Sequence, residues 1–118
     1  MHYICLVLAT TMIVKFDKEY LSELYYEGKC KSKKYRFQPN IVELYKRRID
    51  ILNDSTCIEA LYQMRSLHYE VLSGDKKGIS SIRVNDKYRI EFIVSHDDQQ
   101  GKEKLTICNI TELSNHYK

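Results

Sequence analysis

The sequence predicts an α+β fold in which N-terminal helices pack on one face of a small, mostly antiparallel β-sheet. Three observations lead to this prediction. In the first half of the 118-residue chain, apolar residues recur at the spacing of helices. From residue 67 onward they alternate with polar residues, as they do in strands. Between two of the alternating runs, Asn85-Asp86 is typical of a tight hairpin turn.

The first elements are a strand and two helices. Residues 13–16 predict a short strand, and Asp17 follows as the cap of a first helix that ends at Gly28. A second helix begins near Asn40, where Glu43 lies three residues on and completes a capping box. The apolar side chains of this second helix recur at helical spacing and are expected in the core: Ile41, Leu44, Tyr45, Ile49 and Leu52.

A short third helix and a strand come next. Thr56 and Glu59 form another capping box, which opens a helix that continues to about Arg65. Residues 67–72 alternate between apolar and polar side chains and therefore predict a strand. Because His68 lies between two apolar neighbours of this strand, its side chain is expected to point away from the helices, on the open face of the sheet.

The apolar pattern also predicts the register of the hairpin. A two-residue loop would set the apolar residues of one strand against charged residues of the other. A three-residue loop over 85–87 instead pairs Arg83 with Arg89, so both arginines project from the open face. A last strand is predicted over 102–110, after a polar loop at 96–101.

Composition and charge limit the class of protein. A net charge of +3, an apolar fraction of 43% and a charged fraction of 30% are typical of one globular domain. The four cysteines are widely spaced, with no CxxC pair and no histidine at ligand spacing. They are therefore predicted to be free thiols in a reducing cytoplasm, and no metal ion or cofactor is expected.

Residues 1–11 are predicted to be a leader or a misassigned start, and residues 12–118 a single domain. The apolar stretch at 3–9 lacks the basic flank and the cleavage site of a signal peptide. It is also far shorter than the roughly 18 residues of a membrane span. The chain is therefore expected in the cytoplasm, without contact to a membrane.

Basic residues gather in two blocks, away from most acidic residues. The first block lies between Gly28 and Arg48, where Glu43 is the only acid. Such separation is typical of a surface that binds nucleic-acid phosphates, and equally of two solvated basic loops. The second block contains Lys76, Lys77, Arg83, Lys87 and Arg89.

Residues 67–92, LHYEVLSGDKKGISSIRVNDKYRIEF, resemble the HigB branch of the RelE/ParE toxin superfamily. The shared pattern is Leu-His, a short strand, Gly-Asp, a basic turn and Gly, then Ser-Ile-x-Val and aromatic-Arg-Ile-x-Phe. Ser80 departs from it, since the family usually has an aromatic residue there. The resemblance implies a RelE-like fold and a metal-independent, ribosome-dependent endoribonuclease. Such a toxin cuts messenger RNA and is neutralised by a helix-turn-helix antitoxin.

The resemblance also implies where the site lies. The catalytic histidine and arginine of the family match His68 and Arg89, and its C-terminal acid matches Glu112. The two residues after Glu112 are not the tyrosine and histidine of the family. Their roles pass to His116 and Tyr117 only if the last segment shifts by about one short turn.

Cleavage of RNA by its own 2′-hydroxyl needs a base, an acid and cations around the phosphate. Histidine is suited to proton transfer because the side chain ordinarily titrates at about pH 6.5. The hypothesis assigns proton transfer to His68 and His116, with Glu112 orienting one of them or acting itself. Arg83 and Arg89 hold the phosphate. The residues assigned to contact with RNA or the ribosome are Lys76, Lys77, Lys87, Tyr88 and Tyr117.

Two other interpretations stay open. A ParE-like toxin that inhibits DNA gyrase through protein contacts would need neither His68 nor Arg89. A catalytically inactive homologue that only binds an antitoxin would fit the unmatched C-terminal tail. Arg89 also has a purely structural interpretation, as the ion-pair partner of Glu70 or Glu91.

Overall fold

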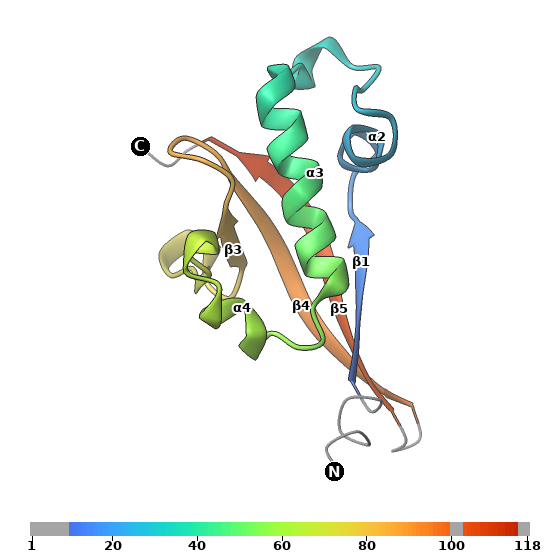
Figure 1. Cartoon of the computed structure of the whole chain (residues 1–118), viewed down its shortest axis with the longest axis vertical. Helices are drawn as coiled ribbons and strands as arrows, with labels where there is room; N and C mark the ends of the chain where they lie inside the picture. Colours follow the sequence, from blue (N-terminus) through green and yellow to red (C-terminus); the bar gives the residue numbers. More distant parts are fainter. Residues whose placement is uncertain (1–9, 100–102, 116–118) are drawn as a thin grey trace.

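A five-stranded β-sheet forms the centre of the protein in the computed structural model, which describes residues 10–99 and 103–115 (Figure 1). The strands are β1 (Thr10–Phe16), β2 (Glu70–Val71), β3 (Ser80–Arg83), β4 (Arg89–Gln99) and β5 (Glu103–Ser114). Their order across the sheet is β1-β5-β4-β3-β2. β1 runs parallel to β5, whereas the other neighbouring strands are antiparallel.

Three α-helices of the described residues pack against this sheet, and α3 crosses in front of it in Figure 1. They are α2 (Glu19–Glu27), α3 (Pro39–Asp54) and α4 (Glu59–Gln63), and the 3-10 turns are η1 (Lys33–Tyr35), η2 (Arg65–Leu67) and η3 (Gly74–Lys76). The predicted α+β fold, with N-terminal helices on a mostly antiparallel sheet, is confirmed. Within residues 10–99 and 103–115, no helix is long and apolar enough to cross a membrane.

The first helix, α2, begins without its predicted cap. Its N-cap is Lys18, whose side chain makes no capping hydrogen bond, so the prediction of Asp17 as the cap is wrong. The backbone N–H of Asp17 donates to the carbonyl oxygen of Ile110 (2.8 Å), which keeps Asp17 alongside β5. The predicted end at Gly28 is confirmed, because this residue has a φ of 79° at the C-cap, a conformation that glycine adopts without strain.

The two later helices also lack the predicted capping boxes. α3 has Gln38 as its N-cap and Pro39 as its first residue, where proline loses no helical hydrogen bond. Asn40 therefore lies inside the helix instead of capping it. α4 has Ile58 as its N-cap in place of Thr56, and it is shorter than predicted because the chain turns at once into η2.

β4 and β5 form a longer hairpin than the apolar pattern predicts. The prediction of a loop over 96–101 is largely wrong, because the two strands pair as far as Gln99 and Glu103. A backbone ladder needs no apolar side chains, so polar residues continue both strands. β5 extends to Ser114, beyond the predicted end at residue 110. β1 begins at Thr10 instead of residue 13, and its parallel pairing with β5 starts with Thr10 opposite Lys104.

The predicted strand over 67–72 is mostly wrong. Its first residue, Leu67, ends η2 and is fully buried in the core. Only Glu70 and Val71 form β2, at an edge of the sheet with β3 as the neighbour. The alternation of apolar and polar side chains matches burial only at Leu67 and Tyr69, since Val71 is exposed. With a partner strand on one side only, the pairing stays short.

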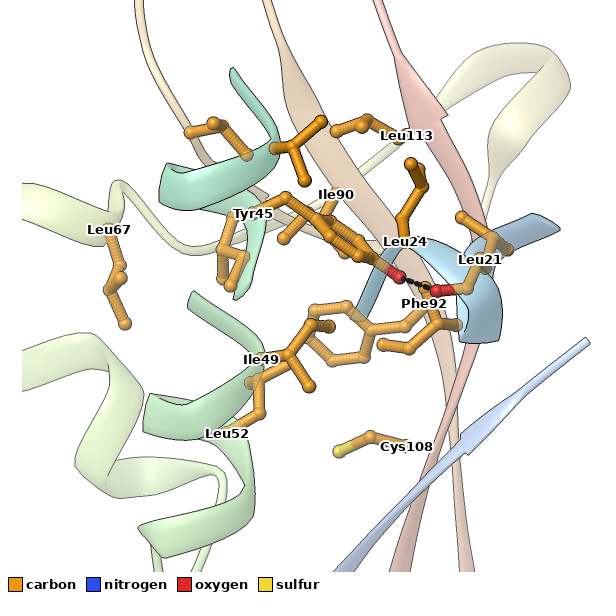
Figure 2. Close-up of a cluster of buried hydrophobic side chains, with 14 of the residues drawn as sticks. Leu21, Leu24, Tyr45, Ile49, Leu52, Leu67, Ile90, Phe92, Cys108 and Leu113 are labelled. Atoms are coloured by element: carbon orange, nitrogen blue, oxygen red, sulfur yellow. Dashed lines mark hydrogen bonds between the residues drawn. The ribbon is translucent and has the colours of Figure 1, made fainter. Parts of the chain in front are cut away.

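The core lies between the helices and one face of the sheet (Figure 2). The predicted core residues of α3 are buried, except that Leu44 is only partly so. In Figure 2 the Tyr45 hydroxyl reaches from α3 to α2, where it donates to the carbonyl oxygen of Leu21 (2.7 Å). Burial raises the pKa of this hydroxyl well above its usual value. The side chains opposite α3 include Ile90, Phe92, Cys108 and Leu113.

Replacing Tyr45 by phenylalanine is expected to lower the free energy of unfolding by about 1–2 kcal/mol, because the buried hydrogen bond to Leu21 is lost. Urea denaturation measures this difference. Tyr26→Phe is the matched control: this tyrosine is exposed, so its change is expected to stay within about 0.5 kcal/mol. Equal stability of Tyr45→Phe and the wild type would show that the hydroxyl does not link the two helices.

Candidate functional site

A row of polar side chains crosses the sheet on the face opposite the core. Glu70 pairs with Ser81, Ser81 with Glu91, and Glu91 with Glu112, so β2 to β5 each contribute one residue. These four residues, hereafter the polar row, share one face because directly paired residues of neighbouring strands project from the same side of a sheet. The row brings the predicted acid Glu112 next to Glu91 and in line with Ser81 and Glu70, and the sequence hypothesis places none of these three in the site.

A second row follows along the same face. Arg83 pairs with Arg89 across β3 and β4, as the sequence predicts, and the three-residue loop between the strands is confirmed. The side-chain oxygen of Asn85 accepts hydrogen bonds from the backbone N–H groups of Lys87 and Tyr88 (2.9 Å each). This side chain therefore fixes the loop, and with it the pairing of the two arginines.

The centre of this face is not open, contrary to the prediction. Ser81, Arg89 and Glu91 are at most 9% exposed. The segment 68–76 folds over them and supplies partners to Arg89 and Glu91. A ligand bound to this face would therefore meet its rim and not its centre. The rim side chains with exposed surface are those of His68, Glu70, Lys76 and Arg83.

His68 lies at this rim in a strained backbone conformation. It follows η2 and has a φ of 46°, in the left-handed region that residues other than glycine rarely adopt. In residues 10–99 and 103–115 it is the only residue other than glycine with a positive φ. Strain of this kind persists where surrounding contacts enforce it, and it gathers at functional sites.

Arg89 supplies one of the contacts that hold His68. A terminal N–H of its guanidinium donates to the carbonyl oxygen of His68. Two further bonds reach Ser81, one to the hydroxyl and one to the carbonyl oxygen (3.2 Å), and Glu70 forms an ion pair at 3.4 Å. Because the guanidinium is planar with donors in a fixed fork, it joins η2, β2 and β3 in one arrangement.

Arg83 differs from Arg89 in its exposure. Its side chain is 35% exposed and forms an ion pair with Asp86, which lies in the exposed loop. Arg48 of α3 donates its Nε–H to the carbonyl oxygen of Arg83 (3.0 Å). Burial, followed by the nearby charge of Arg83, lowers the pKa of Arg48. Positive charge is thus concentrated at this end of the sheet.

Lys76 and Glu91 form an ion pair at the other end of the segment that covers the face. The Lys76 ammonium lies 2.8 Å from a carboxylate oxygen of Glu91. Glu91 precedes a β-bulge between Glu91 and Phe92, where its backbone carbonyl accepts a hydrogen bond from Thr111 (3.1 Å). Lys77, the next residue of the chain, is exposed.

Lys87 and Tyr88 lie apart from the polar row. They line a hollow of about 670 Å³ between the segment that leads into α3 and the β3–β4 loop. Arg36 and Phe37 form its opposite side, and the Phe37 ring meets the Tyr88 ring edge-on at 5.7 Å. Arg83 also lines this hollow and so links it to the candidate site.

The predicted residues thus fall into three places. The structure gathers His68, Lys76, Arg83, Arg89 and Glu112 on one face, and it places Lys87 and Tyr88 beside that face. Lys77 is exposed on the adjoining turn. His116 and Tyr117 lie outside the described residues, so their proposed roles stay predictions.

Sequence reasoning missed the part that buried residues play in the site. Glu91 alternates in the same strand as Arg89, so the sequence does place both on one face, but nothing in it indicates that Glu91 is buried. Nothing in the sequence indicates that Ser81 belongs to the site. Ser80, at the family's aromatic position, is also buried, and its hydroxyl lies 2.9 Å from that of Tyr69.

In the described part of the chain, no group of three or more histidine, cysteine or acidic side chains could hold a metal ion. Cys30, Cys57 and Cys108 are free thiols, which confirms that part of the prediction, and Cys5 lies outside the described residues. Burial raises the pKa of the Cys108 thiol to about 12. The thiolate is the reactive form of cysteine, so Cys108 is expected to be inert.

Brief alkylation of the native protein with iodoacetamide at pH 8 is expected to modify Cys30 and Cys57 but to leave Cys108 unmodified. Cys108 is fully buried, whereas the other two are partly exposed. Peptide mass spectrometry reads the modification of each cysteine. In denaturant all three should react alike, and native labelling of Cys108 as fast as Cys57 would contradict its burial.

A family model described as the RelE-like toxin of the type II toxin–antitoxin system HigB matches residues 14–112. Among solved structures, the YoeB/ParE toxin from Agrobacterium tumefaciens is similar to this chain with a TM-score of 0.49 and 14% sequence identity. That alignment covers 88% of this chain and 98% of the other. No curated protein matches the sequence.

Proposed function

Since the chain belongs to the family of RelE-like HigB toxins of type II toxin–antitoxin systems, we propose that it is an endoribonuclease that cuts messenger RNA on the ribosome. The observation that carries this proposal is the backbone of His68. A histidine in a left-handed conformation lies at the rim of a polar sheet face, and the buried Arg89 holds its carbonyl oxygen. Strain maintained in this way is expected of a catalytic side chain.

The reaction needs only groups that side chains provide. The 2′-oxygen of the RNA attacks the adjacent phosphorus, the bond from phosphorus to the 5′-oxygen breaks, and a 2′,3′-cyclic phosphate and a 5′-hydroxyl result. A base takes the proton of the 2′-hydroxyl, and an acid protonates the leaving 5′-oxygen. Each such proton transfer contributes roughly 10²–10⁴ in rate.

His68 carries out one of the two proton transfers, since its exposed imidazole reaches solvent at the rim. Glu112, in register with Glu91, orients or performs the other together with His116. Arg89 is only 11% exposed at its side chain and is already bonded to His68 and Ser81. Its role is therefore to position His68 rather than to enclose the phosphate.

Arg83 is the arginine that binds the phosphate directly. Its partner Asp86 is 89% exposed, and an exposed ion pair contributes no more than about 1 kcal/mol, so a phosphate can replace it. Lys77, Lys87 and Tyr88 contact RNA of the message or the ribosome beside the site. The RNA leaves the site over Arg83 toward the hollow that Tyr88 lines.

The proposal includes a partner and a compartment. A type II toxin has a cognate antitoxin, and we expect one with a helix-turn-helix domain. The chain acts in the cytoplasm, where ribosomes translate, and it uses neither a metal ion nor a cofactor.

Mapping of messenger RNA 5′ ends in a translating bacterial extract tests the proposal. New ends inside reading frames, absent when initiation is blocked, are the expected result. If no new ends arise and translation continues, the proposed endoribonuclease activity is wrong. A supercoiling assay with purified DNA gyrase would then test the ParE-like alternative.

A further inference from the structure

Glu91 is a buried acid, although an apolar side chain would have a lower desolvation cost at this position. It is 2% exposed and lies on β4, two residues after Arg89 and on the same face. Replacing a buried ion pair by apolar residues of similar size is often neutral or stabilising, so such a pair is weak evidence of a role in stability. A role of Glu91 in the site would explain why a charge is retained there.

The partner of Glu91 extends from the buried centre of the face to its rim. Lys76 lies 2.8 Å from the Glu91 carboxylate, yet its side chain is 35% exposed. An ammonium group has three N–H donors and can bind more than one acceptor at a time. Lys76 can therefore bind an RNA phosphate while it keeps its ion pair with Glu91.

The backbone around Lys76 is held as well. The N–H of Leu72 donates to the carbonyl oxygen of Ile79 (2.8 Å), and the N–H of Gly78 donates to that of Leu72 (3.2 Å). These bonds close the turn that contains η3. The turn thus fixes the backbone that carries Lys76, and the Glu91 carboxylate fixes the position of its ammonium.

This fixed ammonium lies on the sheet face that carries the groups of the proposed mechanism. Glu91 is the register partner of Glu112, and such partners have Cβ atoms roughly 5 Å apart. Arg89, which positions His68, lies two residues from Glu91 on the same strand, a separation of about 7 Å. An ammonium held over Glu91 therefore lies beside Glu112 and near the arginine that holds the backbone of His68.

We propose that Glu91 is a positioning residue of the cleavage reaction, whose buried carboxylate holds the Lys76 ammonium at the rim to bind the phosphate that is cut. This inference rests on the proposed endoribonuclease activity and gives Lys76 a part in the reaction beyond general contact with RNA. Glu91 itself does not touch RNA, because its side chain is buried and paired with Lys76.

The test is a double-mutant cycle on the rate of cleavage of ribosome-bound messenger RNA. Glu91→Gln keeps the shape of the side chain and removes its charge, and Lys76→Gln removes the ammonium. Each single variant should cut at least ~10-fold more slowly at saturating substrate, since a transition-state contact is weakened. The double variant should be no slower than Lys76→Gln alone, because Glu91 acts through Lys76.

The direction of the Glu91→Gln effect separates positioning from general charge. This substitution makes the protein more positive, so non-specific electrostatics alone would give tighter RNA binding and faster cleavage. Positioning instead gives slower cleavage without weaker binding of the ribosome complex. Lys18→Gln is the matched control, since it removes the same charge from an exposed lysine that lies outside both basic blocks and outside the site. Its cleavage rate should stay within about twofold of the wild-type rate.

Effects of Glu91→Gln and Lys76→Gln that multiply in the double variant would overturn the inference, and so would equal losses of cleavage in Lys76→Gln and Lys18→Gln. In both cases cleavage by the wild type would still support the endoribonuclease. Should Glu91→Gln fail to fold, as judged by circular dichroism, the comparison of Lys76→Gln with Lys18→Gln and with the charge-retaining Lys76→Arg decides alone. No cleavage by the wild type would overturn both proposals.

Discussion

Lysine in place of Arg89 is expected to leave a folded protein that cuts RNA at least ~100-fold more slowly. The substitution keeps the positive charge and the ion pair with Glu70, but an ammonium lacks the planar fork that joins Ser81 to the carbonyl oxygen of His68. His68 then loses the contact that holds its strained backbone in place, and misplacement by about 1 Å can cost ~100-fold in rate.

Alanine at the same position provides the comparison for stability. Arg89→Ala removes several hydrogen bonds from the buried face and should lower the free energy of unfolding by about 2–4 kcal/mol. Arg89→Lys should lower it by less than half of that. Denaturant unfolding and single-turnover cleavage, measured on both variants, separate the two effects. If Arg89→Lys cut RNA at the wild-type rate, only the positive charge of residue 89 would be needed. The proposed role of Arg89 in positioning His68 would then be wrong.

Glycine in place of His68 is expected to abolish most cleavage while the protein becomes no less stable than the alanine variant. Both His68→Gly and His68→Ala lose the imidazole, so cleavage should fall by roughly 10²–10⁴ in each. The backbone at residue 68 has a φ of 46°. Glycine adopts this conformation freely, whereas alanine is strained by about 1–2 kcal/mol.

The pair of variants therefore tests chemistry and backbone strain at one position. His68→Gly should unfold at a higher denaturant concentration than His68→Ala, by a difference of about 1 kcal/mol in stability. If alanine were the more stable of the two, residue 68 would not have a left-handed backbone. If either variant cut RNA at the wild-type rate, His68 would not take part in proton transfer.

The hairpin shows how far the sequence alone can predict this site. The apolar pattern decides between two registers, because a shift by one residue would move the apolar side chains of one strand to the solvent face. It therefore predicts the pairing of Arg83 with Arg89 and the three-residue loop, both of which the structure confirms. The helical period likewise predicts most of the buried face of α3.

The rest depends on tertiary contacts that leave no periodic pattern. Residues 67–72 alternate as a strand would, yet His68 has a left-handed conformation that Arg89, 21 residues later in the chain, helps to enforce. Alternation assigns Arg89 and Glu91 to a face, but only the fold of the segment over 68–76 determines that this face is covered. Helix starts differ for a similar reason: Asp17 is available as a cap in the sequence, but in the fold its backbone bonds to β5.

The central claim is that this chain cuts messenger RNA on the ribosome with the sheet face around His68. The most direct measurement is a reconstituted one: purified protein, purified ribosomes and a defined message, with the RNA ends identified chemically. We predict a cut only when ribosomes hold the message, products with a 2′,3′-cyclic phosphate and a 5′-hydroxyl, and loss of the cut in His68→Gly. An intact message with wild-type protein on translating ribosomes, or equal cutting by His68→Gly, would contradict the account.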